Sequence, residues 1–308
     1  MAKILVTGGA GFIGSSVSDA LIESGHQVVI IDNLSTGFKK NINKKAKFYK
    51  IDIRDKKINE IFENEKPDFV NHHAAQMDVR KSIQEPEYDA DVNILGSLNI
   101  IENCIKYKVK KIIYISTGGA VFGEPVYLPA DEKHPINPIC HYGISKHTVE
   151  HYLFLYNYLY GLNFTVLRYP NVFGPRQNPH GEAGVNAIFI GKMLLNEVPT
   201  IYGDGEQLRD YVYIEDIVQA NILALAKGDK GIYNIGTKKG VSVNQIYTTL
   251  QKILNFHKPA NYAPSRPCEI NKIFLNGSLV NKELGWSPKI SFEEGLRKTV
   301  EWFRENRF

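Results

Sequence analysis

Residues 3–14 read KILVTGGAGFIG, an apolar run followed by regularly spaced glycines. The run 3–7 predicts a buried β-strand, and the stretch 11–24 predicts the helix after it. The turn between them carries glycine at every third position, at Gly8, Gly11 and Gly14. Glycine lets the backbone turn tightly and approach a pyrophosphate, whose charge meets the free amides and the positive dipole end of the helix. The stretch therefore favours a dinucleotide-binding turn over a plain glycine-rich connection.

Short apolar strands alternate with helices through the first half of the chain. Continuous β-branched runs separated by helices are typical of a parallel sheet covered on both faces. The pattern predicts further strands at residues 27–31, 48–51, 69–71, 112–116 and 164–168, with long helices at 95–107 and 141–159. The predicted fold class is therefore α/β, a doubly wound parallel sheet of the Rossmann type.

The pattern loosens after residue 170 into segments rich in proline, glycine and asparagine. This region has loops at 170–184 and 202–209 and predicted helices at 247–255 and 292–304. We expect residues 1–170 to form a dinucleotide-binding domain, and residues 171–308 to form mainly a smaller substrate-binding lobe, with some later segments returning to the first domain. Such a lobe closes over the carboxyl ends of the strands, where open parallel sheets bind their ligands.

Asp32 follows the second predicted strand, where its carboxylate can accept both hydroxyls of an adenosine ribose. The same charge would repel a 2′-phosphate. We therefore expect NAD rather than NADP as the cofactor. Asp32-Asn33 is also an ordinary turn-forming pair, but its position is the one that the dinucleotide fold predicts.

Tyr142 and Lys146 lie four residues apart at the start of a predicted helix, so both side chains project from one face. An ammonium beside a phenol stabilises the phenolate and gives a proton acceptor for redox chemistry on a bound nicotinamide. Half ionisation near pH 7 needs roughly 4 kcal/mol, and a lysine at roughly 6 Å supplies about 3 kcal/mol. Tyr107 and Lys111 share this spacing, but they lie where a predicted helix runs into a strand.

Composition favours no other class of function. The net charge of +4 comes from dispersed lysines without interleaved aromatics, which favours a solvated surface over a nucleic-acid groove. Three cysteines are an odd, sparse set that fits a reducing compartment without a disulfide framework. The chain begins directly in a strand and has no apolar run of membrane-spanning length. We expect a cytoplasmic protein that binds neither nucleic acid nor membrane.

A longer series of motifs runs through nearly the whole chain in a fixed order. It comprises Thr7 to Gly14, Asp32, Asp52-Ile53, His73-Ala74-Ala75-Gln76, Asn93, Ser116 to Gly123, Tyr142 to Lys146, Arg168 to Asn171, Gly203-Asp204-Gly205, Arg209 to Val212 and Arg266-Pro267. With this series the chain resembles the extended short-chain dehydrogenase/reductase family and, within it, the UDP-hexose 4-epimerases. The resemblance implies NAD-dependent epimerisation of a UDP-sugar at C4 through a transient 4-keto sugar. It also implies a homodimer formed by the helices at 95–107 and 141–159.

The same resemblance assigns the site residues. Tyr142 would take the C4 hydroxyl proton through or beside Thr117, and Lys146 would also hold the nicotinamide ribose. Cofactor contacts would come from Gly8, Gly11, Phe12, Ile13, Asp32, Asn33, Asp52, Ile53, Ala74, Ala75, Gln76, Asn93, Tyr142, Lys146 and Tyr169. Substrate contacts would come from Thr117, Asn171, Arg209, Arg266, Glu269 and Ile273. Guanidinium groups suit a diphosphate, although a lone arginine is more often a surface ion pair.

Two departures from the family pattern concern the catalytic hydroxyl. Most relatives carry Ser or Thr three residues before the valine of a V-Y-G motif, and here that slot is Gly118. The nearest hydroxyls belong to Thr117 and Ser116. We expect Thr117 to act, with the glycine pair forming a local bulge, and the register between the two hydroxyls stays open. Phe122 replaces the tyrosine of the motif and keeps an aromatic wall without its hydroxyl.

Gly119 and Ala120 discriminate between reactions. In related dehydratases these slots hold an Asp-Glu pair that moves protons during elimination, and related decarboxylases keep the Glu. Without such groups the ketone can do little except take its hydride back, which is epimerisation. The alternatives are an epimerase of UDP-N-acetylhexosamines or UDP-uronic acids, and a non-catalytic dinucleotide-sensing regulator. Ile273 is expected near the sugar C2 substituent, where it is small enough to admit an N-acetyl group, unless it merely packs under the loop.

His147 and His151 have a metal-like spacing of four on the predicted helix. Zinc needs three or four ligands, and no carboxylate or cysteine pair in the sequence accompanies these two, so no metal site is expected. His72 and His73 are expected to end a buried strand rather than act as a base.

Overall fold

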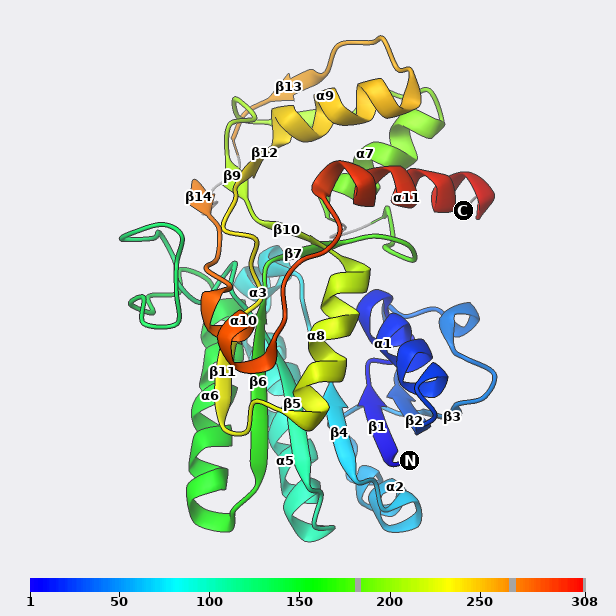
Figure 1. Cartoon of the computed structure of the whole chain (residues 1–308), viewed down its shortest axis with the longest axis vertical. Helices are drawn as coiled ribbons and strands as arrows, with labels where there is room; N and C mark the ends of the chain where they lie inside the picture. Colours follow the sequence, from blue (N-terminus) through cyan, green and yellow to red (C-terminus); the bar gives the residue numbers. More distant parts are fainter. Residues whose placement is uncertain (181–183, 266–269, 307–308) are drawn as a thin grey trace.

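The computed structural model describes residues 1–180, 184–265 and 270–306. Its centre is a seven-stranded parallel sheet with the strand order β11-β6-β5-β4-β1-β2-β3 (Figure 1). The strands are β1 (Lys3–Thr7), β2 (Gln27–Asp32), β3 (Lys47–Lys50), β4 (Phe69–His72), β5 (Lys111–Thr117), β6 (Asn163–Tyr169) and β11 (Gly231–Asn234). The predicted doubly wound parallel sheet is confirmed, and the strands predicted from the first half of the chain agree to within a residue at each end.

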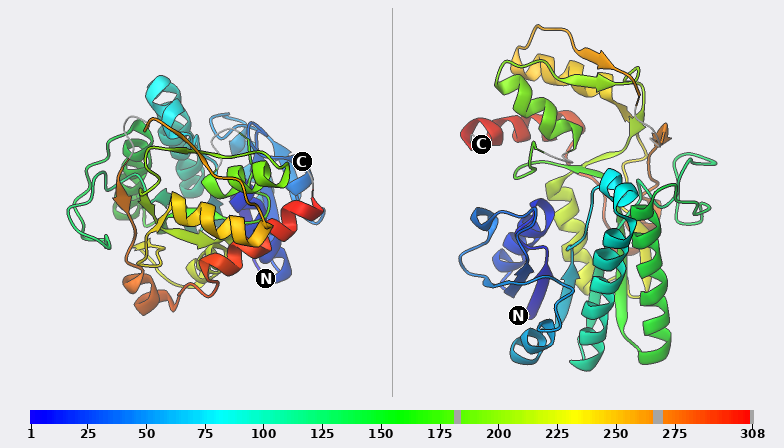
Figure 2. Two further views of the ribbon diagram at one scale, coloured as in Figure 1. Left: turned by 90° about the horizontal axis from the view of Figure 1, so that it is seen from above. Right: turned by 180° about the vertical axis from the view of Figure 1, so that it is seen from behind.

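Alternate residues of the central strands feed two separate cores. In β1, Ile4 and Val6 pack on one face of the sheet and Leu5 packs on the other. The first face is covered by α1 (Phe12–Glu23), α8 (Ile214–Ala226) and α10 (Ser278–Leu284), and the second by α2 (Ile58–Glu65), α5 (Gly96–Lys106) and α6 (His141–Tyr160) (Figures 1 and 2). Burying one aliphatic side chain contributes roughly 1.5–3 kcal/mol, so the alternation decides which face each helix covers.

Shorter helical segments complete the sheet half. They are η1 (Lys39–Asn41), a 3₁₀ turn, then α3 (Val79–Gln84), α4 (Pro86–Ala90) and the π-helical turn η2 (Asp91–Leu95) between β4 and α5. Tyr107 and Lys111, which share the spacing of Tyr142 and Lys146, lie where α5 runs into β5, as predicted. Tyr107 is the C-cap residue of α5, and Lys111 is the first residue of β5.

The second lobe lies beyond the carboxyl ends of the strands (Figure 1). Its helices are α7 (Val185–Leu194), α9 (Val243–Leu254) and α11 (Phe292–Glu305), which pack against one another. α9 begins four residues before the predicted helix because Ser242 and Gln245 form a capping box. The lobe shares one hydrophobic core with the first sheet face, since Phe189 and Leu250 join the cluster that contains Ile4.

Short strands occupy parts of the two segments that were predicted to be loops. β7 (Asn171–Phe173) pairs with β10 (Tyr211–Tyr213), β9 (Leu208–Arg209) lies between β12 (Val241–Ser242) and β14 (Lys272–Ile273), and β8 (Thr200–Tyr202) pairs with β13 (Asn261–Ala263). The predictions of loops at 170–184 and 202–209 were therefore wrong at β7 and β9, whose pairing partners are distant in sequence. The late elements α8, β11 and α10 return to the central sheet.

Candidate active site

Tyr142 lies in the first turn of α6, and its hydroxyl forms a hydrogen bond with the side chain of Thr117. Thr117 is the last residue of β5, so this contact lies at the carboxyl edge of the sheet. Lys146 follows one turn later in α6, is 3% exposed, and places Nζ 4.3 Å from the centre of the Tyr114 ring. The structure thus gathers the three predicted catalytic residues around the end of β5.

Burial shifts the pKa values of Tyr142 and Lys146 in opposite directions. Burial raises the pKa of Tyr142 above its ordinary value, and the hydrogen bond from Thr117 offsets only part of the rise. Burial also lowers the pKa of Lys146 from 10.5 to about 7, against the opposing charges of Glu150 and Asp89. Burial thus opposes the charged form of both groups, and stabilisation of a Tyr142 phenolate by Lys146 stays a prediction.

The register of the catalytic hydroxyl is decided by two packing contacts. Ser116 donates its hydroxyl to Glu150 Oε1 at 2.5 Å in a buried contact, which turns it away from Tyr142. A Cβ added at Gly118 would lie 2.3 Å from Leu275 Cδ1, so the leucine side chain fills the space that a hydroxyl residue would need. The geometry therefore favours Thr117 as the hydroxyl beside Tyr142.

The residues that follow Gly118 bring no acid or base to this point. A Cβ at Gly119 would meet Thr117 Oγ1 at 3.9 Å as its nearest described neighbour, so the position has room that glycine leaves unused. Ala120 is buried. Phe122 is also buried, with Arg168 5.3 Å from its ring centre, and its role as an aromatic wall stays a prediction.

The glycine turn is shaped by three different requirements. Gly8 has φ +68°, and a Cβ there would lie 2.7 Å from the backbone nitrogen of Ala74. A Cβ at Gly14 would lie 2.3 Å from the Gly8 carbonyl oxygen. A Cβ at Gly11 would lie 3.2 Å from the same oxygen, which is a looser contact. Gly11 is the N-cap residue of α1 and makes no side-chain capping bond. The first helical residues, Phe12 and Ile13, are half-buried, so the start of α1 offers backbone amides to an anion.

Asp32 closes this turn from the end of β2. Its carboxylate accepts from the backbone N–H of Ala10 at 2.9 Å and from that of Leu34 at 2.7 Å. A bare helix start, a missing side chain at Gly11 and a carboxylate at the end of β2 together fit the pyrophosphate and ribose of NAD. Recognition of the ribose by Asp32 stays a prediction.

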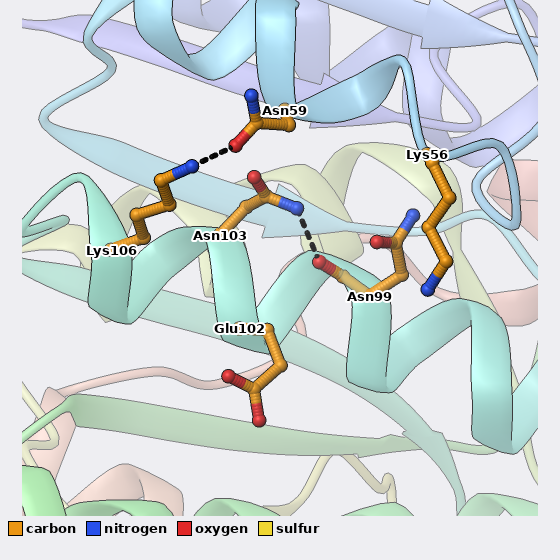
Figure 3. Close-up of a pocket in the computed structure, with 6 residues that line it drawn as sticks. All are labelled: Lys56, Asn59, Asn99, Glu102, Asn103 and Lys106. Carbon is orange, nitrogen blue, oxygen red and sulfur yellow. Dashed lines mark hydrogen bonds between the residues drawn. The ribbon is translucent and has the colours of Figure 1, made fainter.

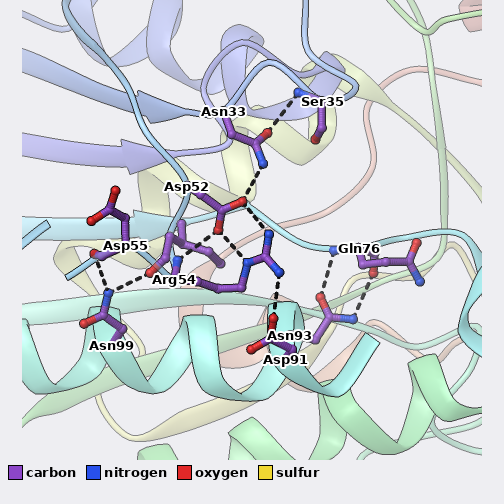
Figure 4. Close-up of polar contacts among 10 residues, drawn as sticks. Asn33, Ser35, Asp52, Arg54, Asp55, Gln76, Asp91, Asn93 and Asn99 are labelled. Carbon is purple, nitrogen blue, oxygen red and sulfur yellow. Dashed lines mark hydrogen bonds and ion pairs between the residues drawn. The ribbon is translucent and has the colours of Figure 1, made fainter. Parts of the chain in front are cut away.

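Two predicted cofactor residues, Asn33 and Asp52, form one polar cluster with Arg54 (Figure 4). Asn33 donates to Asp52 Oδ2 at 2.8 Å, and Arg54 grips both Asp52 oxygens, each at 2.9 Å. A further Arg54 nitrogen lies 2.6 Å from Asp91. The hydrogen bond from Arg54 lowers the pKa of Asp52 to about 2. The sequence analysis gave Arg54 no role, because nothing in its spacing marks it as a site residue. Its neighbour Ile53, a predicted cofactor contact, is buried.

Asn93 is part of the scaffold under the loop after β4 (Figure 4). Its oxygen accepts from the backbone N–H of Gln76 at 2.9 Å, and its amide nitrogen donates to the Gln76 carbonyl at 2.9 Å and to Asp89 at 3.0 Å. Ala74, which donates its N–H to Thr7, and Ala75 are half-buried in the same loop. The structure gives Asn93 a positioning role, and a direct cofactor contact stays a prediction.

The predicted substrate residues come from three short strands. Asn171 begins β7 and is exposed, Arg209 ends β9, and Ile273 pairs with Arg209 from β14. Arg209 donates to the backbone carbonyl of its neighbour Leu208 at 3.0 Å. The predicted Arg266 and Glu269 lie outside the described residues.

Ile273 and Tyr169 are more deeply placed than expected. Ile273 is 2% exposed and belongs to a small core with Phe122 and Leu275, which favours the packing alternative over a gate at the sugar. Tyr169 ends β6, is buried, and its hydroxyl accepts a hydrogen bond from Asn221.

Asp210 is a buried carboxylate in the Arg209 to Val212 motif, and no role was predicted for it from the sequence. It accepts from the hydroxyl of Thr237 at 2.5 Å and from the backbone N–H of Thr237 at 2.9 Å and of Leu275 at 3.1 Å. Its own backbone bonds to Asn171 and Ile273. Asp210 therefore ties together the strands that carry the predicted substrate residues, and burial raises its pKa from 3.8 to about 6.

His72, His147 and His151 make contacts with other side chains. His72 ends β4 and contacts the hydroxyls of Thr7 at 2.6 Å and Ser97 at 2.9 Å, as predicted for a buried strand end. His147 lies 3.0 Å from His151 through their Nε2 atoms. Within residues 1–180, 184–265 and 270–306, no group of three or more metal-ligating side chains converges, and no helix is long and apolar enough to cross a membrane.

A surface hollow between α2 and α5 lies apart from these residues (Figure 3). It is lined by Lys56, Asn59, Asn99, Glu102, Asn103 and Lys106. Lys106 lies 2.5 Å from Asn59, and Asn103 lies 2.7 Å from the Asn99 carbonyl. Because Asn59, Asn99, Glu102, Asn103 and Lys106 already have partners, the hollow is not a second candidate site.

Comparison with known proteins extends the geometry. Residues 4–236 match the NAD dependent epimerase/dehydratase family. A putative UDP-glucose 4-epimerase of Methanocaldococcus jannaschii is 50% identical, covering 98% of this chain and 99% of that protein. The UDP-glucose 4-epimerase of Thermotoga maritima, solved with UDP-glucose, is 50% identical with TM-score 0.97, covering 98% of this chain and 99% of that one. The Thermus thermophilus UDP-glucose 4-epimerase, solved with NAD, is 42% identical with TM-score 0.93 and the same coverage. This chain therefore belongs to the NAD dependent epimerase/dehydratase family.

Proposed function

We propose that this chain interconverts UDP-glucose and UDP-galactose by NAD-dependent epimerisation at C4. The observation that carries the proposal is the contact between Tyr142 and Thr117 at the carboxyl edge of the sheet, one helical turn from Lys146. Gly119 and Ala120 follow Thr117 without an acid or base, which argues against elimination chemistry. The relatives from Methanocaldococcus and Thermotoga carry the same activity in their names.

The glycine turn holds the cofactor in this proposal. The first amides of α1 receive the pyrophosphate beside Gly11, and Asp32 accepts the adenosine ribose hydroxyls. Asp52 and Ile53 border the adenine, and Asn33 donates to Asp52. When bound, the nicotinamide supplies the hydride acceptor and a positive charge near the phenol. Lys146 donates to the nicotinamide ribose.

The acid–base work falls to Tyr142 and Thr117. Thr117 bridges the C4 hydroxyl and the phenol, and Tyr142 accepts the proton as C4 gives up its hydride. Tyr142 must ionise for this step, and the pKa of the buried phenol is raised, so cationic charge from Lys146 and the cofactor has to lower it. The 4-keto sugar turns about its diphosphate, and Tyr142 then returns the proton as hydride adds to the other face.

The substrate lobe anchors the UDP group. Arg209 and Arg266 are proposed to bind the diphosphate, because guanidinium groups give paired charged hydrogen bonds to phosphate oxygens. Asn171 and Glu269 complete the contacts to the nucleotide-sugar. Arg266 and Glu269 lie outside the described residues, so their proposed contacts rest only on the sequence motif that contains them.

We further propose that the protein is a cytoplasmic homodimer that serves galactose metabolism. The second half of α6 exposes large apolar side chains, among them Phe154 at 67% and Tyr158 at 80% exposure. Leu95, directly before α5, is 57% exposed. Light scattering on the purified chain should give twice the monomer mass, and a monomer that keeps full activity would refute the dimer.

A panel of UDP-sugars tests the proposed function. UDP-galactose should yield UDP-glucose, with slower inversion of UDP-N-acetylglucosamine and none of UDP-glucuronate. The Tyr142→Phe protein, purified in parallel, controls for contaminating enzymes. Preference for the N-acetylated or uronic sugar would move the assignment to those epimerases, and absence of inversion with every sugar would refute it.

A further inference from the structure

Glu150 is a buried carboxylate one turn after Lys146 in α6, and it is 2% exposed. It accepts from Arg168 at 2.5 and 3.0 Å and from the hydroxyl of Ser116 at 2.5 Å. His147 contacts it through Nδ1 at 3.1 Å. Burial alone would raise the pKa of Glu150, but the hydrogen bonds from His147 and Arg168 outweigh it and lower the pKa to about 2. Glu150 is therefore ionised at any pH at which the protein works.

The partners of Glu150 border the residues proposed to act. Ser116 immediately precedes Thr117 at the end of β5, and Arg168 immediately precedes Tyr169 at the end of β6. One carboxylate thus ties α6 to two neighbouring strands of the sheet. A buried ion pair gives little net stability, since desolvation of both charges offsets their attraction. The cost of burying this pair points to a use in the site.

Lys146 lies one turn before Glu150 on the same helix, so the two side chains share one face of α6. Charges and titratable groups face its ammonium from four elements: Tyr142 and Glu150 on α6, Asp89 on α4, His72 and His73 at the end of β4, and Tyr114 on β5. Glu150 and Asp89 favour the ammonium form, and burial opposes it. Arg168, Ser116, His147 and Tyr114 face Glu150 itself.

We propose that Glu150 is a positioning residue that keeps Lys146 charged inside the site while fixing the end of β5 against α6. The inference rests on the proposed function for its consequence, because a neutral lysine could neither stabilise the phenolate nor donate fully to a ribose. The expected change in the pKa of Lys146, however, does not depend on whether the protein turns over a UDP-sugar. Removing the charge at residue 150 must make Lys146 lose its proton at lower pH.

The direct test follows the Lys146 ammonium by NMR in the full chain labelled at the lysine side-chain carbons, with Lys146→Met to assign the signal. In Glu150→Gln the Lys146 titration should move down by about one pH unit or more, because a nearby opposite charge has been removed. Glu65→Gln is the matched control, since Glu65 is also a buried glutamate paired with lysine, but in α2. It should leave the titration in place. His147→Gln keeps the carboxylate and should move the signal by less than half as much.

The kinetic counterpart is a pH profile. Glu150→Gln should lose kcat at alkaline pH first, with the alkaline limb displaced in the same direction, and KM for the UDP-sugar should change less than about threefold. If Glu150→Gln does not fold, the double variant Glu150→Gln/Arg168→Met removes both charges, and the Lys146 titration should still move down but by less, because the loss of the Arg168 charge offsets part of the effect. An unmoved Lys146 titration in either variant overturns the inference, whatever the outcome of the turnover assay. A moved titration in a protein without epimerase activity would refute the proposed function alone.

Discussion

Glu150 and Asp210 are buried carboxylates in the two halves of the molecule, and they differ in the charge of their partners. Glu150, in the sheet half, accepts from the Arg168 guanidinium. Asp210, in the substrate half, accepts from neutral groups of Thr237 and Leu275. Burial acts to raise both pKa values, but the hydrogen bonds from His147 and Arg168 reverse it at Glu150, whereas burial prevails at Asp210. Glu150 thus has a buried countercharge, and Asp210 is held by neutral donors.

The two halves are also built differently around these carboxylates. In the sheet half, β5 and β6 form a regular parallel ladder that fixes Thr117 and Tyr169. In the substrate half, β9 and β14 have two residues each, so side-chain bonds to Asp210 take over part of that work. The contrast implies that changes in the sheet half stop the chemistry, whereas changes in the substrate half alter stability and sugar binding.

Tyr142→Phe should give the largest effect. The variant should fold and retain NAD but lose 10²- to 10⁴-fold in kcat, since this is the usual contribution of a positioned acid–base group. KM for the UDP-sugar should change little, because the anchoring residues lie in the other half. Steady-state kinetics with cofactor content measured on the same sample check this, and near-normal turnover would rule out Tyr142 as the base.

Asp210 should give the protein an unusual pH response. Its folded pKa of about 6 lies above the ordinary 3.8, so the ionised form destabilises the fold above pH 6 and this penalty disappears as pH falls. Relative to Asp210→Asn, the wild type should gain about 2 kcal/mol of unfolding free energy between pH 7 and 4.5. Glu150 acts in the opposite sense, because its stabilisation is lost only as pH falls below about 4.5.

Denaturant unfolding of both proteins at several pH values separates these two contributions. Parallel stability curves for wild type and Asp210→Asn between pH 7 and 4.5 would show that Asp210 is ionised throughout, and the contrast between the halves would fail.

Gly118→Ser probes the seam between the halves. The new Cβ would lie 2.3 Å from Leu275 Cδ1, and Leu275 is 1% exposed and cannot move freely. Overpacking of this kind costs roughly 1–3 kcal/mol. Thermal unfolding should show the loss, and Gly118→Ser should cost less when it is introduced into a Leu275→Ala background than into the wild type. A Gly118→Ser protein as stable as wild type would mean that Leu275 does not exclude the hydroxyl seen in most relatives.

Asp32→Asn should produce the smallest change. It keeps one acceptor for the N–H groups of Ala10 and Leu34 while removing the charge. NAD affinity should fall about tenfold, as expected for one weakened charged hydrogen bond, and NADP affinity should rise. Calorimetry on cofactor-stripped protein measures both, with Asp32→Ala as the more disruptive comparison. Tight NADP binding by the wild type would contradict the role of Asp32.

Local patterns were sufficient to predict the sheet and most of its helices. Apolar runs of five or so residues between helices mark buried strands directly, and Gly8, Asp32, Tyr142 and Lys146 stand at positions that local spacing defines. The site features that failed depend on distant partners. Gly118 replaces a hydroxyl residue because Leu275 fills its space, and Ile273 is buried because Phe122 covers it.

Two further features that were not predicted have the same physical origin. The raised pKa of Tyr142 comes from burial, which a pair spacing does not reveal. Asp210 bonds to Thr237 and Leu275, which the fold alone brings together. Strands of two or three residues in the substrate half likewise carry too few residues to show a periodicity.

The central claim is that the sheet half removes hydride from C4 and returns the same hydride to the opposite face while the substrate half holds the UDP group. UDP-galactose deuterated at C4 tests it most directly, with the product UDP-glucose analysed by NMR and mass spectrometry. The account predicts UDP-glucose that retains deuterium at C4, with no label passing to solvent. Inverted product that has lost the label, or a dehydrated product, would contradict it.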